Sequence, residues 1–143
     1  MTRYLSAIGP RALAASLFLS TALAGTALAQ SQFTAALSGP GNGDGTAMVT
    51  VDPDANTVCY DVTVMLTPPA TAAHIHRGEA GANGPIVVPF ESPASGNSSG
   101  CVQGVDPALI SDILTNPAGF YVNVHNPDFP GGAIRGQLTP SGM

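Results

Sequence analysis

Short runs of alternating apolar and polar residues, separated by clusters of glycine and proline, recur along most of this sequence. In the longest run, residues 58–66, an apolar side chain occupies every second position, which is the pattern of a half-buried strand. The further runs of this kind are residues 33–37, 46–51, 72–76, 86–90, 120–125 and 133–138. Many short strands joined by Gly/Pro turns predict an all-β domain, either a sandwich or a barrel.

One helix is predicted among these strands. Asp106 can cap its N-terminus, and Pro107 suits the first helical position. Its apolar side chains fall on one face: Ile110, Ile113 and Leu114. We expect this helix to end at Asn116 and to cover one open end of the β-structure. We expect residues 92–100, which are rich in serine and glycine, to form a flexible surface loop.

The first thirty residues have a different character from the rest of the chain. Two arginines precede an Ala/Leu-rich run at residues 12–23, and residues 27–29 read Ala-Leu-Ala. This pattern predicts a secretory signal peptide over residues 1–29, because the apolar run is shorter than the roughly 20 residues of a membrane span. The mature protein is then a single domain, residues 30–143, that is periplasmic or secreted and has no membrane span.

Charge limits what this domain can bind. The chain has 4 Lys plus Arg against 9 Asp plus Glu, and none of the cations is lysine. Only Arg77 and Arg135 lie beyond residue 29, so the mature domain carries a net charge of about −7. Nucleic acid is excluded as a partner, because neutralising its phosphates requires a cluster of cations.

The predicted export indicates how the two cysteines, Cys59 and Cys101, are used. In an oxidising compartment an even pair of cysteines predicts a disulfide. Closing a loop of about 43 residues stabilises the fold by roughly 4 kcal/mol in the chain-entropy model. A metal site containing cysteine is a weaker interpretation, because the sequence has no Cys-x-x-Cys or Cys-x-His spacing.

Two of the three histidines lie on one short predicted strand. His74 and His76 are separated by one residue, so their side chains point to the same face, about 6.5 to 7 Å apart at their bases. Ala73 and Ile75 alternate with them and are expected to face the core. Both imidazoles are therefore predicted on the outer face of the sheet.

The third histidine, His125, ends the predicted strand at residues 120–125 on its polar side, together with Tyr121 and Asn123. A glycine-rich loop follows each histidine segment, at residues 78–84 and 126–132. If the two strands are neighbours, three imidazoles form one site, which suits Cu, Zn, Fe or Ni and binds Cu(II) most tightly. No carboxylate is placed to be a fourth ligand; the nearest in sequence are Glu79 and Asp128. The alternative is that the histidines only satisfy backbone or loop groups.

Arg135 lies on the strand that follows His125. If the two strands form a hairpin in which His125 pairs with Ala133, then Arg135 lies opposite Asn123 on the face that carries His125. A cation beside a metal site can attract a small anion. The alternative, which we favour, is that Arg135 pins the loop by pairing with a nearby acid, Asp128 or Glu79.

Four segments of the sequence resemble the chordin-type (CHRD) domain. They read A-H-I-H-R-G at residues 73–78, G-P-I-V-V at 84–88, F-Y-V-N-V-H at 120–125 and G-A-I-R-G-Q-L at 132–138. The resemblance covers about residues 33–138. It implies an exported all-β domain of the immunoglobulin-like or Greek-key type, as a sandwich or a barrel, and it does not supply a reaction.

The order of the histidines and the late arginine is also similar, more loosely, to the copper-site layout of copper-zinc superoxide dismutases. In that family a paired and a late histidine bind copper, and an arginine near the end of the chain guides the anion. Carried over, His74, His76 and His125 are copper ligands and Arg135 is the guide. The chain has no further histidine for a bridging ligand or a zinc site, so only a copper-only variant is compatible with the resemblance.

These observations predict an exported copper-binding protein with a three-histidine site, used for storage, delivery or redox chemistry. Zinc is the second choice of metal, because three histidines with an open position can hold it. Two alternatives are a non-catalytic extracellular interaction module without metal and a copper-only superoxide dismutase. The predicted partners are the metal ion and an extracellular or periplasmic protein.

Overall fold

The computed structural model describes residue 25 and residues 29–142 of the chain. The predicted signal peptide at residues 1–29 lies outside the described residues except for its positions 25 and 29, so it stays a prediction. None of the helices in the described part of the chain has the length and apolar character needed to cross a lipid bilayer.

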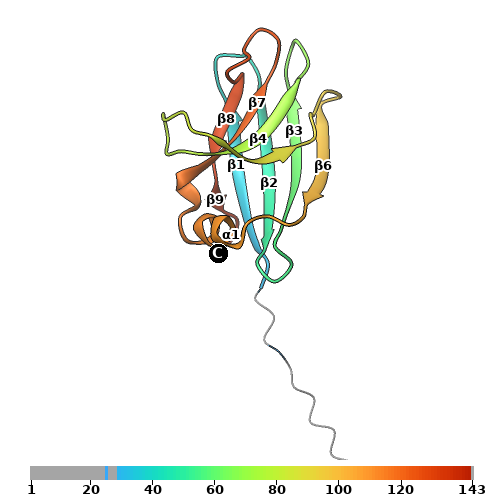
Figure 1. Cartoon of the computed structure of the whole chain (residues 1–143). Helices are drawn as coiled ribbons and strands as arrows, with labels where there is room; N and C mark the ends of the chain where they lie inside the picture. The colour runs from blue at the N-terminus through green and yellow to red at the C-terminus, as the bar shows by residue number, and fades with distance from the viewer. Residues whose placement is uncertain (1–24, 26–28, 143) are drawn as a thin grey trace, which may run out of the picture.

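The described residues form a nearly closed antiparallel β-barrel with one short helix (Figure 1). The strands, in chain order, are β1 (Ser31–Ser38), β2 (Asp44–Asp52), β3 (Thr57–Met65), β4 (Ala72–Arg77), β5 (Ile86–Phe90), β6 (Asn97–Val102), β7 (Phe120–His125), β8 (Ile134–Gln137) and β9 (Thr139–Pro140). Their spatial order is β5-β4-β7-β8-β1-β2-β3-β6, and β9 pairs with β1. The all-β prediction is confirmed, in its barrel form.

The side chains at every second position of the strands fill the inside of this barrel. On β3 the side chains of Val58, Val62 and Val64 are buried, while Asp61 and Met65 face outward. Each buried valine stabilises the fold by roughly 1.5 to 3 kcal/mol relative to an exposed one. The same alternation on β1 and β2 adds six further side chains to one continuous core: Phe33, Ala35, Leu37, Ala47, Val49 and Val51.

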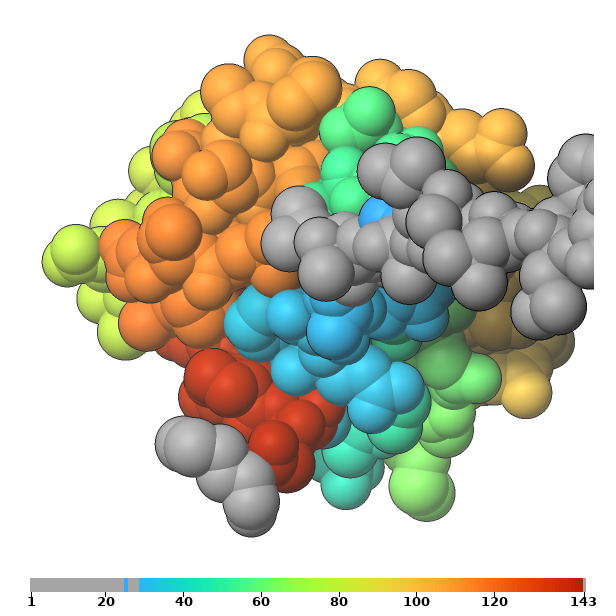
Figure 2. All heavy atoms as spheres, turned by 90° about the horizontal axis from the view of Figure 1, so that it is seen from below, coloured from blue at the N-terminus to red at the C-terminus, as the bar shows by residue number. Residues whose placement is uncertain are grey.

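Helix α1 (Pro107–Thr115) covers one end of the barrel, as predicted (Figure 1). The Asp106 carboxylate accepts a hydrogen bond from the Ala108 amide at 2.9 Å, which caps the first turn. Ile110 and Ile113 are buried and belong to the core. Seen from this end, the helix lies against the start of the chain's first strand (Figure 2). The 3-10 turn η1 (Pro117–Gly119) then leads into β7.

The predicted flexible loop at residues 92–100 is wrong in its second half. Residues Asn97–Val102 form strand β6, which pairs with β3 along its length. None of its side chains is fully buried, and its half-buried positions are Ser98, Gly100 and Val102. Because two of these three are not apolar, no apolar alternation marks the strand in the sequence. The register places Cys59 opposite Cys101, and the predicted disulfide between them is present.

Candidate metal centre

The two strands that carry the histidines are neighbours. Strands β4 and β7 pair antiparallel, with Ala72 opposite His125 and His74 opposite Asn123. Ala73 and Ile75 are fully buried in the barrel interior, so the side chains that alternate with them point outward, as predicted. The register therefore brings all three histidines onto one outer patch of the barrel wall.

The three imidazoles gather around a single point. The Nδ1 atom of His74 lies 3.2 Å from the Nε2 atom of His125. The ring centroid of His76 lies 5.6 Å from that of His74 and 5.9 Å from that of His125. One nitrogen from each ring lies within 4.8 Å of the other two, so the group could hold a metal ion. Metal–nitrogen bonds to histidine are roughly 2.0–2.1 Å long, so an ion among these rings would draw their nitrogens together.

Two of the rings are held from behind by main-chain carbonyl groups. His76 Nδ1 donates to the Gly84 carbonyl and His125 Nδ1 donates to the Pro130 carbonyl, each at 2.9 Å. A carbonyl can only accept, so both rings carry a proton on Nδ1, and the neutral form of each ring keeps its lone pair on Nε2. This is the arrangement in which a ligand histidine is oriented by its second nitrogen.

The Nε2 atom of His76 is buried and has no hydrogen-bond partner. A buried polar atom without a partner costs free energy, and native structures contain few of them. This atom belongs to the three-histidine cluster and carries a free lone pair. An ion bound by the three histidines would satisfy it.

The electrostatics at His74 favour a neutral imidazole. Partial burial lowers the pKa of His74 below its ordinary value of 6.5, and the charges of His125 and His76 lower it further. A neutral imidazole is the form that binds a metal. Among the described residues the cluster contains no carboxylate oxygen, so its donor set is three imidazole nitrogens. Glu79 and Asp128, the acids nearest in sequence, are exposed.

Arg135 occupies the predicted position but does not have the predicted partner. It lies opposite Asn123 on β8, as expected. Instead of pairing with an acid, its guanidinium donates to the Ala82 carbonyl at 2.8 Å and to the Asn83 side-chain oxygen at 3.2 Å. It also lies 3.5 Å above the centre of the Tyr121 ring. The expected acid pairing is therefore wrong, because the β4–β5 loop folds back across β7 and β8 and offers its own oxygens (Figure 1).

Tyr121 and Asn123 share the face of His125, as predicted, yet they are buried rather than solvated. Their exposed fractions are 1% and 4%. The Tyr121 hydroxyl accepts a hydrogen bond from the Gly84 amide at 3.1 Å, and the Asn123 side-chain nitrogen donates to the Gly131 carbonyl at 3.3 Å. Neither residue was predicted to have a role at the site. The only signal for them was their spacing of two and four residues from His125.

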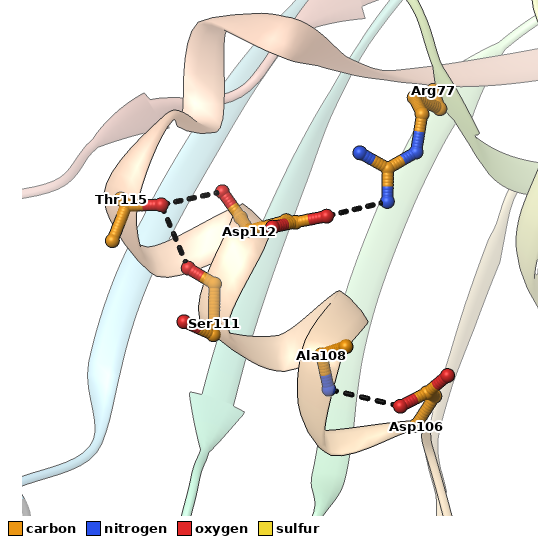
Figure 3. Close-up of polar contacts among 6 residues, drawn as sticks. All are labelled: Arg77, Asp106, Ala108, Ser111, Asp112 and Thr115. Atoms are coloured by element: carbon orange, nitrogen blue, oxygen red, sulfur yellow. Dashed lines mark hydrogen bonds and ion pairs between the residues drawn. The ribbon is translucent and has the colours of Figure 1, made fainter.

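The other arginine of the barrel takes no part in the cluster. Arg77 forms an ion pair with Asp112 of α1 at 2.8 Å (Figure 3). Its guanidinium also lies 4.8 Å from the centre of the Phe120 ring. Arg77 therefore joins the end of β4 to the helix, on the side of the barrel that α1 covers.

A nearly closed antiparallel barrel with three histidines on its outer wall, between two glycine-rich loops, defines the class of this protein. Residues 24–138 match the CHRD domain. Since the match covers most of the chain, the protein belongs to the CHRD family, which confirms the resemblance seen in the sequence. A search of the curated proteins gives no significant match.

Proposed function

We propose that this protein binds one copper ion through His74, His76 and His125, in an exported setting, and that it stores, delivers or uses copper in redox chemistry. The observation that carries the proposal is the convergence of three imidazoles from two strands, with the Nε2 atom of His76 buried and unpaired. Rings that served only to satisfy loop groups would have no need to converge.

The donor set favours copper over the other metals. The cluster offers three imidazole nitrogens and no carboxylate or thiolate, because both cysteines are bonded to each other. Imidazole suits Cu and Zn alike, and the affinity order of the divalent metals places Cu(II) above Zn(II). Three histidines leave one position open, which in a zinc site is filled by water.

Export is proposed on sequence grounds and agrees with the cysteine chemistry. The first thirty residues have the pattern of a signal peptide. Disulfides persist in the periplasm and outside the cell and are rare in the cytosol, so the Cys59–Cys101 bond supports the same location.

Calorimetric titration with Cu(II) and with Zn(II) tests the metal site. We expect the unaltered protein to bind one copper ion, and a variant with all three histidines replaced by alanine to lose at least about 100-fold in affinity. Asp61→Asn, which changes an exposed side chain on β3, is the control for weak binding at surface acids. Equal and weak binding by all three proteins would rule out the site.

The two alternative functions receive less support. A copper-only superoxide dismutase needs a cation that is free to guide an anion, whereas Arg135 is engaged by Ala82, Asn83 and Tyr121. Superoxide consumption by the copper-loaded protein, with and without Arg135→Ala, measures this role. An interaction module without metal offers no reason for the three rings to lie together.

A further inference from the structure

His76, Tyr121 and Gly84 form a closed ring of contacts. Tyr121 lies opposite His76 on β7, and the two aromatic rings stack with a centroid distance of 5.0 Å and an angle of 13°. The Tyr121 hydroxyl accepts from the Gly84 amide, and the Gly84 carbonyl accepts from His76 Nδ1. Each of the three residues thus contacts the other two.

This ring of contacts fixes both side-chain rotations of His76. Stacking against Tyr121 sets the plane of the His76 ring, and the hydrogen bond to the Gly84 carbonyl decides which edge of the ring faces the loop. A ring flipped by 180° would lose the Nδ1 hydrogen bond. The only orientation that keeps every contact leaves Nε2 buried and unpaired within the cluster.

The glycine in this ring cannot be exchanged for another residue without moving the loop. A Cβ atom at Gly84 would overlap the Arg77 carbonyl oxygen. The Arg77 amide also donates to the carbonyl of Pro85 at 3.0 Å. Residue 84 is therefore held close against the end of β4, and both of its main-chain polar groups serve the ring of contacts.

Arg135 contacts Tyr121 from β8, the strand that flanks β7 on the side away from β4. Strand β7 lies between β4 and β8, so His76 and Arg135 approach Tyr121 from its two sides in the sheet. Arg135 also holds the loop at Ala82 and Asn83, directly before Gly84. The position of the Tyr121 ring and the path of the loop are thus fixed by the same guanidinium.

We propose that Tyr121 is a positioning residue of the metal site, which through Gly84 holds the Nε2 atom of His76 towards the ion, and that Arg135 keeps this arrangement in place. The inference rests on the proposed function. It assigns Tyr121 no contact with the metal. Loss of an outer partner of this kind typically weakens metal binding by about 10- to 100-fold.

The chain contains a matched control for the tyrosine hydroxyl. Tyr60 on β3 stacks on Phe90 with a centroid distance of 4.1 Å, and its hydroxyl accepts from the Glu91 amide at 2.8 Å. Both tyrosines are buried. Tyr121→Phe and Tyr60→Phe therefore remove the same chemical bond, an amide hydrogen bond to a stacked phenol, but only one of the two removes it beside a histidine of the cluster.

Two measurements compare these variants. Titration with Cu(II) gives the affinity, and electron paramagnetic resonance of the copper-loaded protein reports the coordinating nitrogens. We expect Tyr121→Phe to lose about 10-fold in affinity, at the low end because the stack remains, with a changed nitrogen hyperfine pattern. Tyr60→Phe should match the unaltered protein in both measurements.

Nitrogen NMR of the metal-free proteins tests the positioning separately from the metal. We expect the Nδ1 proton of His76 to exchange with water faster in Tyr121→Phe than in Tyr60→Phe. Equal proton exchange and equal copper binding in the two variants would overturn the inference while leaving the copper site intact. If the triple histidine variant binds copper as well as the unaltered protein, the proposed function fails, and the exchange rate of the His76 proton still decides whether Tyr121 positions that ring.

Discussion

The Nδ1 atom of His74 and the Nε2 atom of His125 lie 3.2 Å apart across the β4–β7 pair. A neutral His125 ring that donates its Nδ1 proton to the Pro130 carbonyl can only accept at Nε2, and His74 then carries its proton on Nδ1 in the metal-free protein. Binding of a metal through these two nitrogens replaces this hydrogen bond and displaces the proton. An ion that binds these two nitrogens must therefore break the hydrogen bond between His74 and His125.

Copper should raise the thermal stability of the protein through this site. A ligand that binds only the folded state stabilises it by about 2.7 kcal/mol when its free concentration is 100 times its dissociation constant. We expect the melting temperature to rise with copper concentration in the unaltered protein and to stay constant in the triple histidine variant. A calorimetric scan at several copper concentrations measures this. A parallel rise in both proteins would place the binding elsewhere.

Acid should destabilise the metal-free protein partly through His74. The pKa of His74 in the folded protein is lowered below 6.5, mainly by burial and further by His125 and His76, so the unfolded chain takes up the proton first as the pH falls. The free energy of unfolding should therefore fall as the pH drops below about 6.5. Urea unfolding at about pH 7.5 and about pH 5.5 measures this fall. The free energy of unfolding should fall less between the two pH values in His74→Gln than in the unaltered protein. An equal loss in both proteins would contradict the prediction.

Removal of the disulfide should weaken the fold but not the metal site. The bond joins β3 to β6 across a sequence separation of 42 residues. Replacing Cys59 and Cys101 with serine should lower the free energy of unfolding by about 2–4 kcal/mol, because the unfolded chain regains its freedom. Copper affinity should be unchanged, since β3 and β6 are not neighbours of β4 or β7. Urea unfolding and copper titration of the same variant test both halves.

Arg135 should restrain the β4–β5 loop. Arg135→Met keeps an apolar contact with Tyr121 and removes both hydrogen bonds to the loop, so we expect faster hydrogen exchange of the amides at residues 78–84. Arg77→Met is the control: it breaks the ion pair with Asp112, whose side chains are 47% and 51% exposed, and such pairs contribute at most about 1 kcal/mol. Its effect should be confined to the contact with α1 (Figure 3). Unchanged exchange in Arg135→Met would exclude the restraint.

Much of the fold and of the site could be predicted because both depend on local periodicity. Alternation identified the strands with a buried face, and the Asp106-Pro107 pair located the start of the helix. The spacing of His74, His76 and His125 placed all three rings on the outer face, and the hairpin register placed Arg135 opposite Asn123. The strands and the facing of the histidines follow from the two-residue repeat, the helix start from its capping residues, and the position of Arg135 from the register of one hairpin.

The remainder depends on contacts between distant segments. Strand β6 has no buried side chain and therefore no pattern in the sequence. The burial of Tyr121 and Asn123 comes from loops that fold over the sheet, and the partners of Arg135 are oxygens of one of those loops. A main-chain carbonyl is present at every residue, so the sequence cannot indicate which one will face a given side chain.

Two of the three cluster histidines are oriented by the carbonyl groups of Gly84 and Pro130, which are present whatever side chains the loops carry. Substitutions in these loops can change their surface while the acceptors stay in place, provided that the backbone keeps its course. Insertions or deletions shift the acceptors themselves. Engineering of this protein, or transfer of its centre to another barrel, should therefore preserve loop length first and loop composition second.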